Sequence, residues 1–279
     1  MRTRTRLLTA LAGVALTFTA IAAHAQALEE GRLLLATQVL NDARNARDQG
    51  IPDRLLERAY GIAVIPDFTK VAFFLGGSRG HGVLVVRDAS GHFSNPIFVT
   101  LTGGSFGFQW GVQKTDLVLV FTSPKGIEGV EGGKLTLGAD VSVAAGPVGR
   151  QASAATDQAF NAGVYSYSHS RGIFAGVALS GAALTIDDAA NATLYHHPGL
   201  LATSIISGAV TTDDYAAREF QTAVLQGAGL EPSSMASSAA APSANVQSAA
   251  PAKPNGPAAQ AFPLQDTNPG SNPGGNPPN

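Results

Sequence analysis

The stretch Ser105–Gly111 constrains the fold of this chain more than any other part of the sequence. It reads Ser-Phe-Gly-Phe-Gln-Trp-Gly, so aromatic residues occupy every second position and the residues between them are small or polar. In a β-strand, successive side chains point to opposite faces of the sheet. This spacing therefore predicts a strand with one aromatic face and one nearly bare face, where the glycines mark a close approach by another backbone or a ligand.

Short apolar runs of the same kind fill the middle of the chain. They are rich in Val, Ile, Phe and Leu and are separated by turn signals such as Pro66-Asp67 and Gly103-Gly104. Because no long helical pattern interrupts most of them, they predict antiparallel pairing. The expected strands are Gly61–Ile65, Lys70–Leu75, His81–Arg87, Pro96–Leu101, Ser105–Gly111, Thr115–Phe121, Leu135–Pro147, Val164–Ser170, Ile173–Leu179 and Leu184–Asp187.

Helices are predicted on both sides of these strands. In Ala27–Gln49, Leu28, Leu35, Val39 and Ala46 fall along one stripe, which Leu33, Leu40 and Ala43 widen. The other expected helices are Asp53–Ala59, a turn at Pro124–Gly132, and Thr212–Gln226. The fold class is therefore α+β: an antiparallel β-barrel or sandwich of short glycine-rich strands, covered by N-terminal and C-terminal helices. The mixed charges of the first helices favour this covering role over an amphipathic element that lies on a membrane.

The two ends of the chain differ from its middle. Residues 1–25 combine Arg2, Arg4 and Arg6, an apolar run and a small-x-small site, which predicts an export signal. Residues 231–279 hold ten prolines and only three charged residues, which predicts a disordered tail. The folded domain should then span residues 26–230. The chain contains no cysteine, so we expect an exported protein of the bacterial periplasm or exterior that can associate with a membrane, without disulfides or a lipoprotein anchor.

Composition and motifs exclude several classes of function. Without the three arginines of the signal, 15 basic residues face 20 acidic ones, a formal charge of −5, which argues against nucleic-acid binding. Ser78 and Ser105 each lie in a G-x-S-x-G pattern, but a strand rather than a helix is expected after both. The histidines are scattered, and Asp187-Asp188 reads as the exit of a strand into a turn. No catalytic residue, metal ligand or cofactor is predicted.

An ordered set of short motifs resembles the SYLF domain family, over about Arg32–Gln226. The motifs are Ala59–Pro66, Gly76-Gly77, Gly80–Leu84, Asn95-Pro96, Gly103–Gly111, Asp116–Val120, Leu137–Pro147, Tyr165–Ser168 and Gly172–Gly176. The resemblance implies a lipid-binding module, with phosphoinositide binding described for eukaryotic members and actin binding for some. It also implies that bacterial members are exported and not enzymes. The acidic balance of this chain and its lack of an SH3 domain argue against actin and phosphoinositides as its partners.

The expected function is therefore a non-enzymatic lipid- or phospholipid-binding protein of the bacterial cell envelope, with an anionic phospholipid or membrane surface as its partner. Arg54 and Arg58 on the second helix, with Lys70 and Arg79 beside the first strong strand, are the candidate lipid-binding residues. A local cationic cluster can bind an anionic headgroup even on an acidic protein, because salt confines its field to about 10 Å. The alternative is a structural or protein-interaction module of the envelope that binds no lipid.

Overall fold

A computed structural model describes residues 25–46, 50–72, 75–88, 90–106, 111–148, 161–170 and 173–230. All of these residues belong to one compact unit. The expected export signal, apart from Ala25, and the expected tail lie outside them. Among the helices of the described ranges, none combines the length and the apolar character that crossing a membrane requires.

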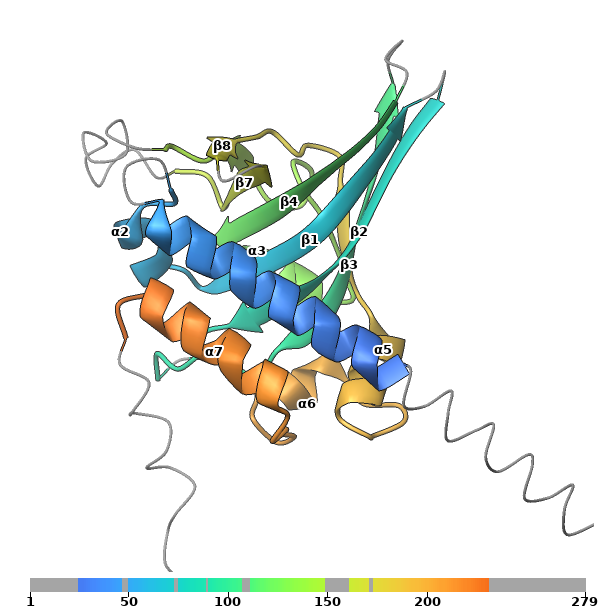
Figure 1. Cartoon of the computed structure of the whole chain (residues 1–279), viewed down its shortest axis with the longest axis vertical. Helices are drawn as coiled ribbons and strands as arrows, with labels where there is room; N and C mark the ends of the chain where they lie inside the picture. Colours follow the sequence, from blue (N-terminus) through green and yellow to red (C-terminus); the bar gives the residue numbers. More distant parts are fainter. Residues whose placement is uncertain are drawn as a thin grey trace, which may run out of the picture. The chain divides into compact units, whose positions relative to one another are not determined.

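The N-terminal helix spans residues 25–45 and crosses the sheet diagonally (Figure 1). Its buried residues recur every three or four positions, at Leu33, Ala36, Leu40 and Ala43, as a helix packed on a sheet requires. The expectation that Leu28 and Leu35 belong to this buried stripe is wrong, because their side chains are 59% and 47% exposed. At about 100° per residue both leucines lie on one flank of the stripe.

Five shorter helices follow within the described ranges. The helices expected near residues 53, 124 and 212 are confirmed, although the last begins at Tyr215, where Asp214 caps it. Two helices between the last strand and the C-terminal helix were not expected from the sequence. The bounds are α2 Asp53–Glu57, α3 Pro124–Glu131, α5 Asp188–Leu194, α6 Ala202–Ile206 and α7 Tyr215–Gly227.

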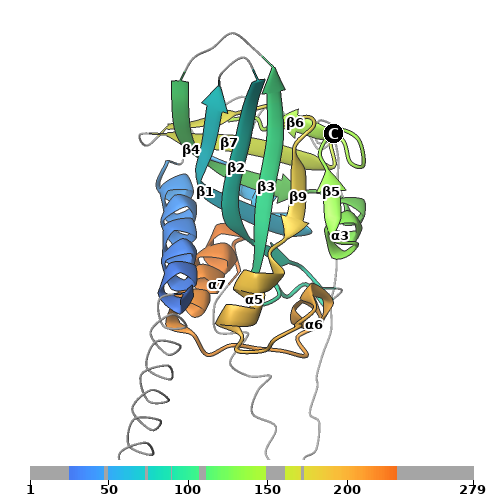
Figure 2. The same ribbon diagram turned by 90° about the vertical axis from the view of Figure 1, so that its right-hand side faces the viewer.

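The strands form one nine-stranded sheet in the order β5-β9-β3-β2-β1-β4-β7-β6, with β8 paired to β7. Every pairing is antiparallel except that of β6 with β7, so the expected antiparallel sheet is confirmed. The bounds are β1 Gly61–Ala72, β2 Leu75–Val86, β3 Ile97–Phe106, β4 Gly111–Phe121, β5 Lys134–Thr136, β6 Val143–Ala145, β7 Val164–Ser170, β8 Ile173–Gly176 and β9 Ala183–Ile186. The sheet curls into a half-barrel (Figure 2).

The first four strands are much longer than the sequence predicted. Pro66-Asp67 does not end a strand but lies in a β-bulge, where the register between β1 and β4 shifts and Asp67 has a φ of 51°. The glycine-rich run Gly76–Gly80 lies inside β2, paired on both sides, and Gly103-Gly104 lies inside β3. Proline is compatible with a strand at a bulge, and glycine is compatible where a neighbouring backbone is close, so neither residue type had to mark a turn here.

The prediction that Ser105–Gly111 forms one strand is also wrong. β3 ends at Phe106, β4 begins at Gly111, and residues 107–110 lie outside the described residues. β2 and β1 separate β3 from β4 in the sheet, and β3 and β4 run in opposite directions. Ser105 and Gly111 therefore belong to two different strands.

The helices cover the two faces of the curled sheet differently. On the convex face, the N-terminal helix and α7 lie side by side (Figures 1 and 2), and Arg44 Nη1 donates a hydrogen bond to Gln226 Oε1 between them. On the concave face, α3 packs against β5, β9 and β4. The core between these layers contains fully buried Ile62, Leu84 and Phe121. The expected α+β architecture with helices from both ends of the domain is thus confirmed.

Beyond the N-terminal helix, the four long strands continue as a distal sheet, which comprises residues 69–72, 75–79, 103–106 and 111–115. β9 pairs with β3 only up to Thr102, and β7 pairs with β4 only from Asp116. Within the described ranges, the outer edges of β3 and β4 in the distal sheet therefore have no paired strand. Figure 2 shows this part of the sheet rising above the helix.

Two glycines of β2 bring that strand close to the bulge of β1. A methyl group at Gly82 would overlap the carbonyl oxygen of Val64, and one at Gly80 would overlap the side chains of Ile65 and Phe68. At Gly77, on the same strand, a methyl group would meet no atom within 4 Å. The close approach is therefore confined to the part of β2 that packs on the bulge.

We expect Gly82→Ala to lower the free energy of unfolding by roughly 1–3 kcal/mol, because β1 must move to accept the methyl group. Gly77→Ala is the matched control and should leave stability unchanged or raise it slightly, since the site is open and alanine restricts the unfolded chain. Urea unfolding of the two variants tests this. Equal stability of both would show that β1 and β2 tolerate a side chain at the bulge.

Candidate functional site

A groove of about 570 Å³ lies on the convex face between the N-terminal helix and the distal sheet. Leu28 and Leu35 border it from the helix, and Thr69 and Arg79 border it from β1 and β2. The two leucines are the exposed residues on the flank of the buried stripe. The groove therefore has aliphatic side chains on one side and a cationic side chain on the other.

A row of valines and glycines continues this face across the distal sheet. Val112 of β4 is opposite Val71 of β1, Val71 is opposite Gly77 of β2, and Gly77 is opposite Gly104 of β3. Residues that are opposite each other share a face of the sheet. The valine side chains are 40% exposed at Val71 and 66% exposed at Val112. The row of valines and glycines is thus open to a partner, and the next row on the same face, formed by Lys114, Thr69, Arg79 and Thr102, is polar.

The cations beside this row differ in their pairing. Lys114 Nζ lies 3.9 Å from Asp67 Oδ1, and both side chains are mostly exposed. Arg79 is exposed and takes part in no ion pair with another residue of the described ranges. Arg79 is therefore the cation of this face whose charge is available to a ligand.

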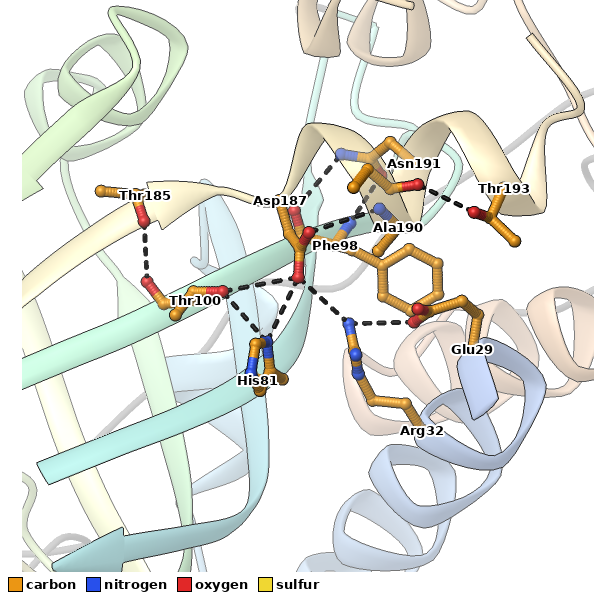
Figure 3. Close-up of polar contacts among 11 residues, drawn as sticks. Glu29, Arg32, His81, Phe98, Thr100, Thr185, Asp187, Ala190, Asn191 and Thr193 are labelled. Carbon is orange, nitrogen blue, oxygen red and sulfur yellow. Dashed lines mark hydrogen bonds and ion pairs between the residues drawn. The ribbon is translucent and has the colours of Figure 1, made fainter. Parts of the chain in front are cut away.

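Asp187 holds the N-terminal helix over the groove (Figure 3). Its Oδ2 lies 3.6 Å from Arg32 Nη1 of the helix and 3.2 Å from His81 Nδ1 of β2. The same oxygen accepts a 3.5 Å hydrogen bond from the Thr100 hydroxyl of β3, while Oδ1 accepts from the backbone N–H of Ala190 and so caps α5. One carboxylate thus joins the helix, two strands and α5.

Buried polar groups support this junction. Arg32 also pairs with Glu29 at 3.0 Å, and its guanidinium lies 5.0 Å from the centre of the Phe98 ring. The side chain of Asn191 is fully buried and satisfies the backbone of Phe98, because Oδ1 accepts from its N–H and Nδ2 donates to its carbonyl. The sequence analysis assigned no structural role to these residues. Asp187 followed by an alanine-rich segment is a helix N-cap signal, and it was interpreted as a turn.

Burial changes the acidity of Glu29. Loss of contact with water disfavours its charged form and raises its pKa above the usual 4.5. The positive charge of Arg32 opposes this shift, and the negative charge of Asp187 adds to it. Because the pKa is raised, burial outweighs the ion pair, and ionised Glu29 is a source of instability in the folded domain.

A second contact fixes the other end of the N-terminal helix. The buried His169 of β7 places Nδ1 3.1 Å from Asp116 Oδ2 of β4 and Nε2 4.0 Å from Asp42 Oδ2 of the helix. Its ring stacks on Phe174 with 4.4 Å between the centroids. Asp116 also accepts the backbone N–H of Asp67 at the bulge. The helix is thus attached to the sheet by charged groups near both of its ends.

The structure does not bring the four predicted lipid-binding cations together. Arg54 and Arg58 are exposed on and just after α2, before β1 begins. Lys70 and Arg79 lie near the far end of β1, about 30 Å away at roughly 3.3 Å per strand residue. Thr69 is opposite Arg79 and Lys70 is opposite Ser78, so Lys70 and Arg79 point to opposite faces of the sheet. The sequence could not reveal this, because it did not predict the register of β1 and β2.

The serine motifs have no nucleophile-elbow geometry where the structure describes them. Ser78 lies inside β2, and its hydroxyl donates to the carbonyl of Gly103 on the neighbouring strand. Ser105 is the last but one residue of β3. Among the described residues, no three His, Asp, Glu or Cys side chains are grouped as metal ligands. The features that remain are surfaces and pockets for binding.

The fold and these surfaces define a small α+β binding domain built on a single curled sheet. Residues 102–226 match the family model described as "Ysc84: Las17-binding protein actin regulator". The match confirms, for residues 102–226, the resemblance to the SYLF domain family noted from the sequence. The description of the family names a binding role, in which its members regulate actin.

Named relatives come from yeast and vertebrates. LAS seventeen-binding protein 3 of Saccharomyces cerevisiae is 37% identical over 165 residues, which cover 58% of this chain and 36% of the relative. Protein YSC84 of the same yeast is 39% identical over 151 residues, or 53% and 32% of the two chains. SH3 domain-containing YSC84-like protein 1 of Xenopus laevis is 32% identical over 169 residues, or 60% and 50%. The matched region thus spans about a third to a half of the length of these relatives.

Removing the Asp187 carboxylate should loosen the junction. We expect Asp187→Ala to lower the free energy of unfolding by about 2–3 kcal/mol, because Arg32 and His81 lose their partner and α5 loses its cap. Asp188→Ala removes an exposed carboxylate from the next position and should cost less than about 1 kcal/mol. Chemical unfolding of both variants measures the difference. Similar losses for the two would show that Asp187 acts only through the charge near the start of α5.

The raised pKa of Glu29 predicts a dependence of stability on pH. Since the folded state holds the Glu29 proton more tightly than the unfolded state, the contribution of this group to stability falls as the pH rises from about 4.5 through the raised pKa. Glu29→Gln removes this dependence, so the variant should gain stability relative to the parent over that interval. Unfolding free energies of both proteins between pH 4 and 8 test the sign. A variant less stable than the parent at pH 7, but equal to it at pH 4, would mean that the ion pair with Arg32 dominates.

Proposed function

We propose that this domain is exported to the bacterial cell envelope and binds the surface of an anionic phospholipid membrane through the distal convex face. The observation that carries the proposal is the groove in which exposed Leu28 and Leu35 face Arg79, beside the open row of Val71 and Val112. Aliphatic side chains next to an available cation suit the boundary between acyl chains and phosphate groups. The signal-like N-terminus and the absence of cysteine support the location.

Membrane binding requires both the positive charge and the apolar side chains of this face. A cation near an anionic membrane contributes on the order of 1 kcal/mol, so Arg79 alone binds too weakly to hold the domain there. Insertion of the leucines and valines adds about 25 cal/mol for each Å² of apolar surface removed from water. Because the chain has a net negative charge, the attraction between Arg79 and the membrane acts only at short range. Salt screens it beyond roughly 10 Å.

The other predicted cations have separate roles in this proposal. Arg54 and Arg58 provide a second cationic position at α2, where Arg58 lines a pocket of about 500 Å³ together with Tyr60 and Arg87. No exposed large aliphatic side chain lines this pocket, so it suits contact with headgroups rather than insertion. Lys70 faces the concave side and does not belong to the membrane surface.

A second candidate function is protein binding, and the free strand edges favour it. Residues 103–106 of β3 and 111–115 of β4 have no neighbour on their outer side within the described ranges, so either edge can accept an added strand. The name of one yeast relative, LAS seventeen-binding protein 3, refers to protein binding, and the family description refers to Las17 binding and actin regulation. A protein partner at these edges is therefore the alternative to a membrane.

Flotation with vesicles separates these functions. The full chain should float with vesicles that contain phosphatidylglycerol and not with vesicles of phosphatidylcholine alone. Arg79→Glu should lower partitioning about 10- to 30-fold, because a two-charge change near the surface is worth about 2 kcal/mol. Leu28→Gln combined with Leu35→Gln should also lower it. Higher salt should weaken the binding of the parent.

The matched control is Arg218→Glu, which reverses an exposed cation on α7 and should not change flotation. Loss of flotation in an Arg54→Glu, Arg58→Glu double variant, with Arg79→Glu unaffected, would move the membrane site to α2. A parent chain that never floats would rule out the membrane proposal and leave protein binding at the strand edges.

A further inference from the structure

The concave face contains a second pocket, of about 610 Å³, on the opposite side of the distal sheet from the groove. Phe68 and Leu117 are buried at its floor, and the half-buried Val177 and Leu179 line it from the segment after β8. This volume falls within the range of roughly 300–1,000 Å³ that is usual for small-molecule sites. The pocket thus offers an apolar surface that an aliphatic chain can fill.

The register of the strands separates this pocket from the convex groove. Phe68 is opposite Thr115, Lys70 is opposite Gln113, and Leu117 is opposite Ser168, so all of these side chains share one face. Arg79 and Thr69 share the other face. Lys114 of the edge strand β4 also lines the pocket although it is opposite Thr69 of the other face, so the two sites adjoin at this strand. Changes at Lys70 and at Arg79 still alter one site without the other, because these two side chains lie on opposite faces.

Lys70 gives this pocket a positive charge. It is half-buried, and it forms no ion pair with any residue of the described ranges. Among the described residues, no aspartate or glutamate lines the pocket, and the hydroxyls of Thr115 and Ser168 already donate to backbone carbonyls. The other lysine of the lining, Lys114, lies near Asp67. Lys70 is thus the group that can meet an anionic ligand.

We propose that the concave pocket binds one molecule of a single-chain amphiphile with an anionic head. The aliphatic chain packs on Phe68, Leu117, Val177 and Leu179, and the head, a carboxylate or a phosphate, meets the Lys70 ammonium. A free fatty acid and a single-chain phospholipid share this chemistry. The site goes beyond the membrane surface proposed above, because it takes a monomeric ligand out of water rather than docking the domain on a bilayer.

The probe for this site is 11-dansyl-undecanoate, a fluorescent fatty acid, titrated into the full chain below its micelle concentration. We expect saturable binding of one molecule per chain. Dodecanoate and dodecyl phosphate should displace the probe, and the stronger of the two identifies the head as carboxylate or phosphate. Dodecyltrimethylammonium, with the same chain and a cationic head, should displace it at least about tenfold less well, because Lys70 repels it.

Variants then assign the residues. Lys70→Gln should weaken probe binding about tenfold, the effect of one charged contact, and Leu179→Trp should abolish it by filling the pocket. Arg79→Gln is the matched control, since it removes a cation from the neighbouring strand on the other face and should bind the probe like the parent. In vesicle flotation the pattern should be reversed, with Arg79→Gln weakened and Lys70→Gln unchanged.

Thermal unfolding of each variant shows whether it is folded, and Val177→Trp replaces Leu179→Trp if the latter is unstable. A parent chain that does not bind the probe would overturn the proposal, whatever the vesicles show. Equal losses for Lys70→Gln and Arg79→Gln would overturn the assignment of the head to Lys70. Probe binding by a chain that never floats would support the pocket and rule out the membrane surface.

Discussion

The position of the N-terminal helix depends on the Asp187 carboxylate, and the groove on the convex face depends on that position. The carboxylate lies where the end of β9 passes into α5, and it reaches Arg32 of the helix and His81 of β2 at once. The contact is partly shielded from water, which strengthens it relative to an exposed ion pair. With the helix fixed there, its flanking leucines face the distal sheet, and the groove exists.

Alternation along the strands gives the distal sheet two chemically different faces. Neighbouring positions on β1, Thr69 and Lys70, belong to opposite sides, so one short segment contributes to the convex groove and to the concave pocket. The convex side is open, and its valines are exposed beside bare glycines. On the concave side, Val177 and Leu179 of the segment that follows β8 line a pocket of mixed apolar and polar side chains. A single sheet thus offers a flat surface and a pocket, and a flat surface suits a large partner while a pocket suits a small one.

The sequence predicted which helices and strands the fold contains better than it predicted the lengths of the strands. Apolar periodicity was sufficient to locate most helices and strands, because burial imposes it directly. Strand lengths were wrong where proline and glycine were interpreted as turns, since Pro66 lies at a bulge and Gly80 and Gly82 allow β1 to approach closely. Both effects depend on the neighbouring strand, which local sequence does not show.

The candidate site was harder to predict for the same reason. Among the candidate cations, Arg79 lies in the groove, but only the register of β1 and β2 separates it from Lys70. The groove also depends on Leu28 and Leu35, which the periodicity of the helix assigned to the core. The Asp187 junction joins residues from positions 29 to 191 of the chain, and no local pattern relates them. Contacts between residues so far apart in the sequence can be recognised only in the folded structure.

The leucines on the helix flank lead to a final inference about the partner of the convex face. A single exposed leucine is common on protein surfaces and needs no explanation. Here Leu28 and Leu35 adjoin the face that carries Val71 and Val112, across a groove whose far side holds Arg79. Contiguous apolar surface next to an available charge marks an interaction site more often than an accident of packing. Glu29 and Asp67, the carboxylates that line the groove, already face Arg32 and Lys114. The anionic membrane proposed above fits this face, because its interface presents apolar surface and negative charge together.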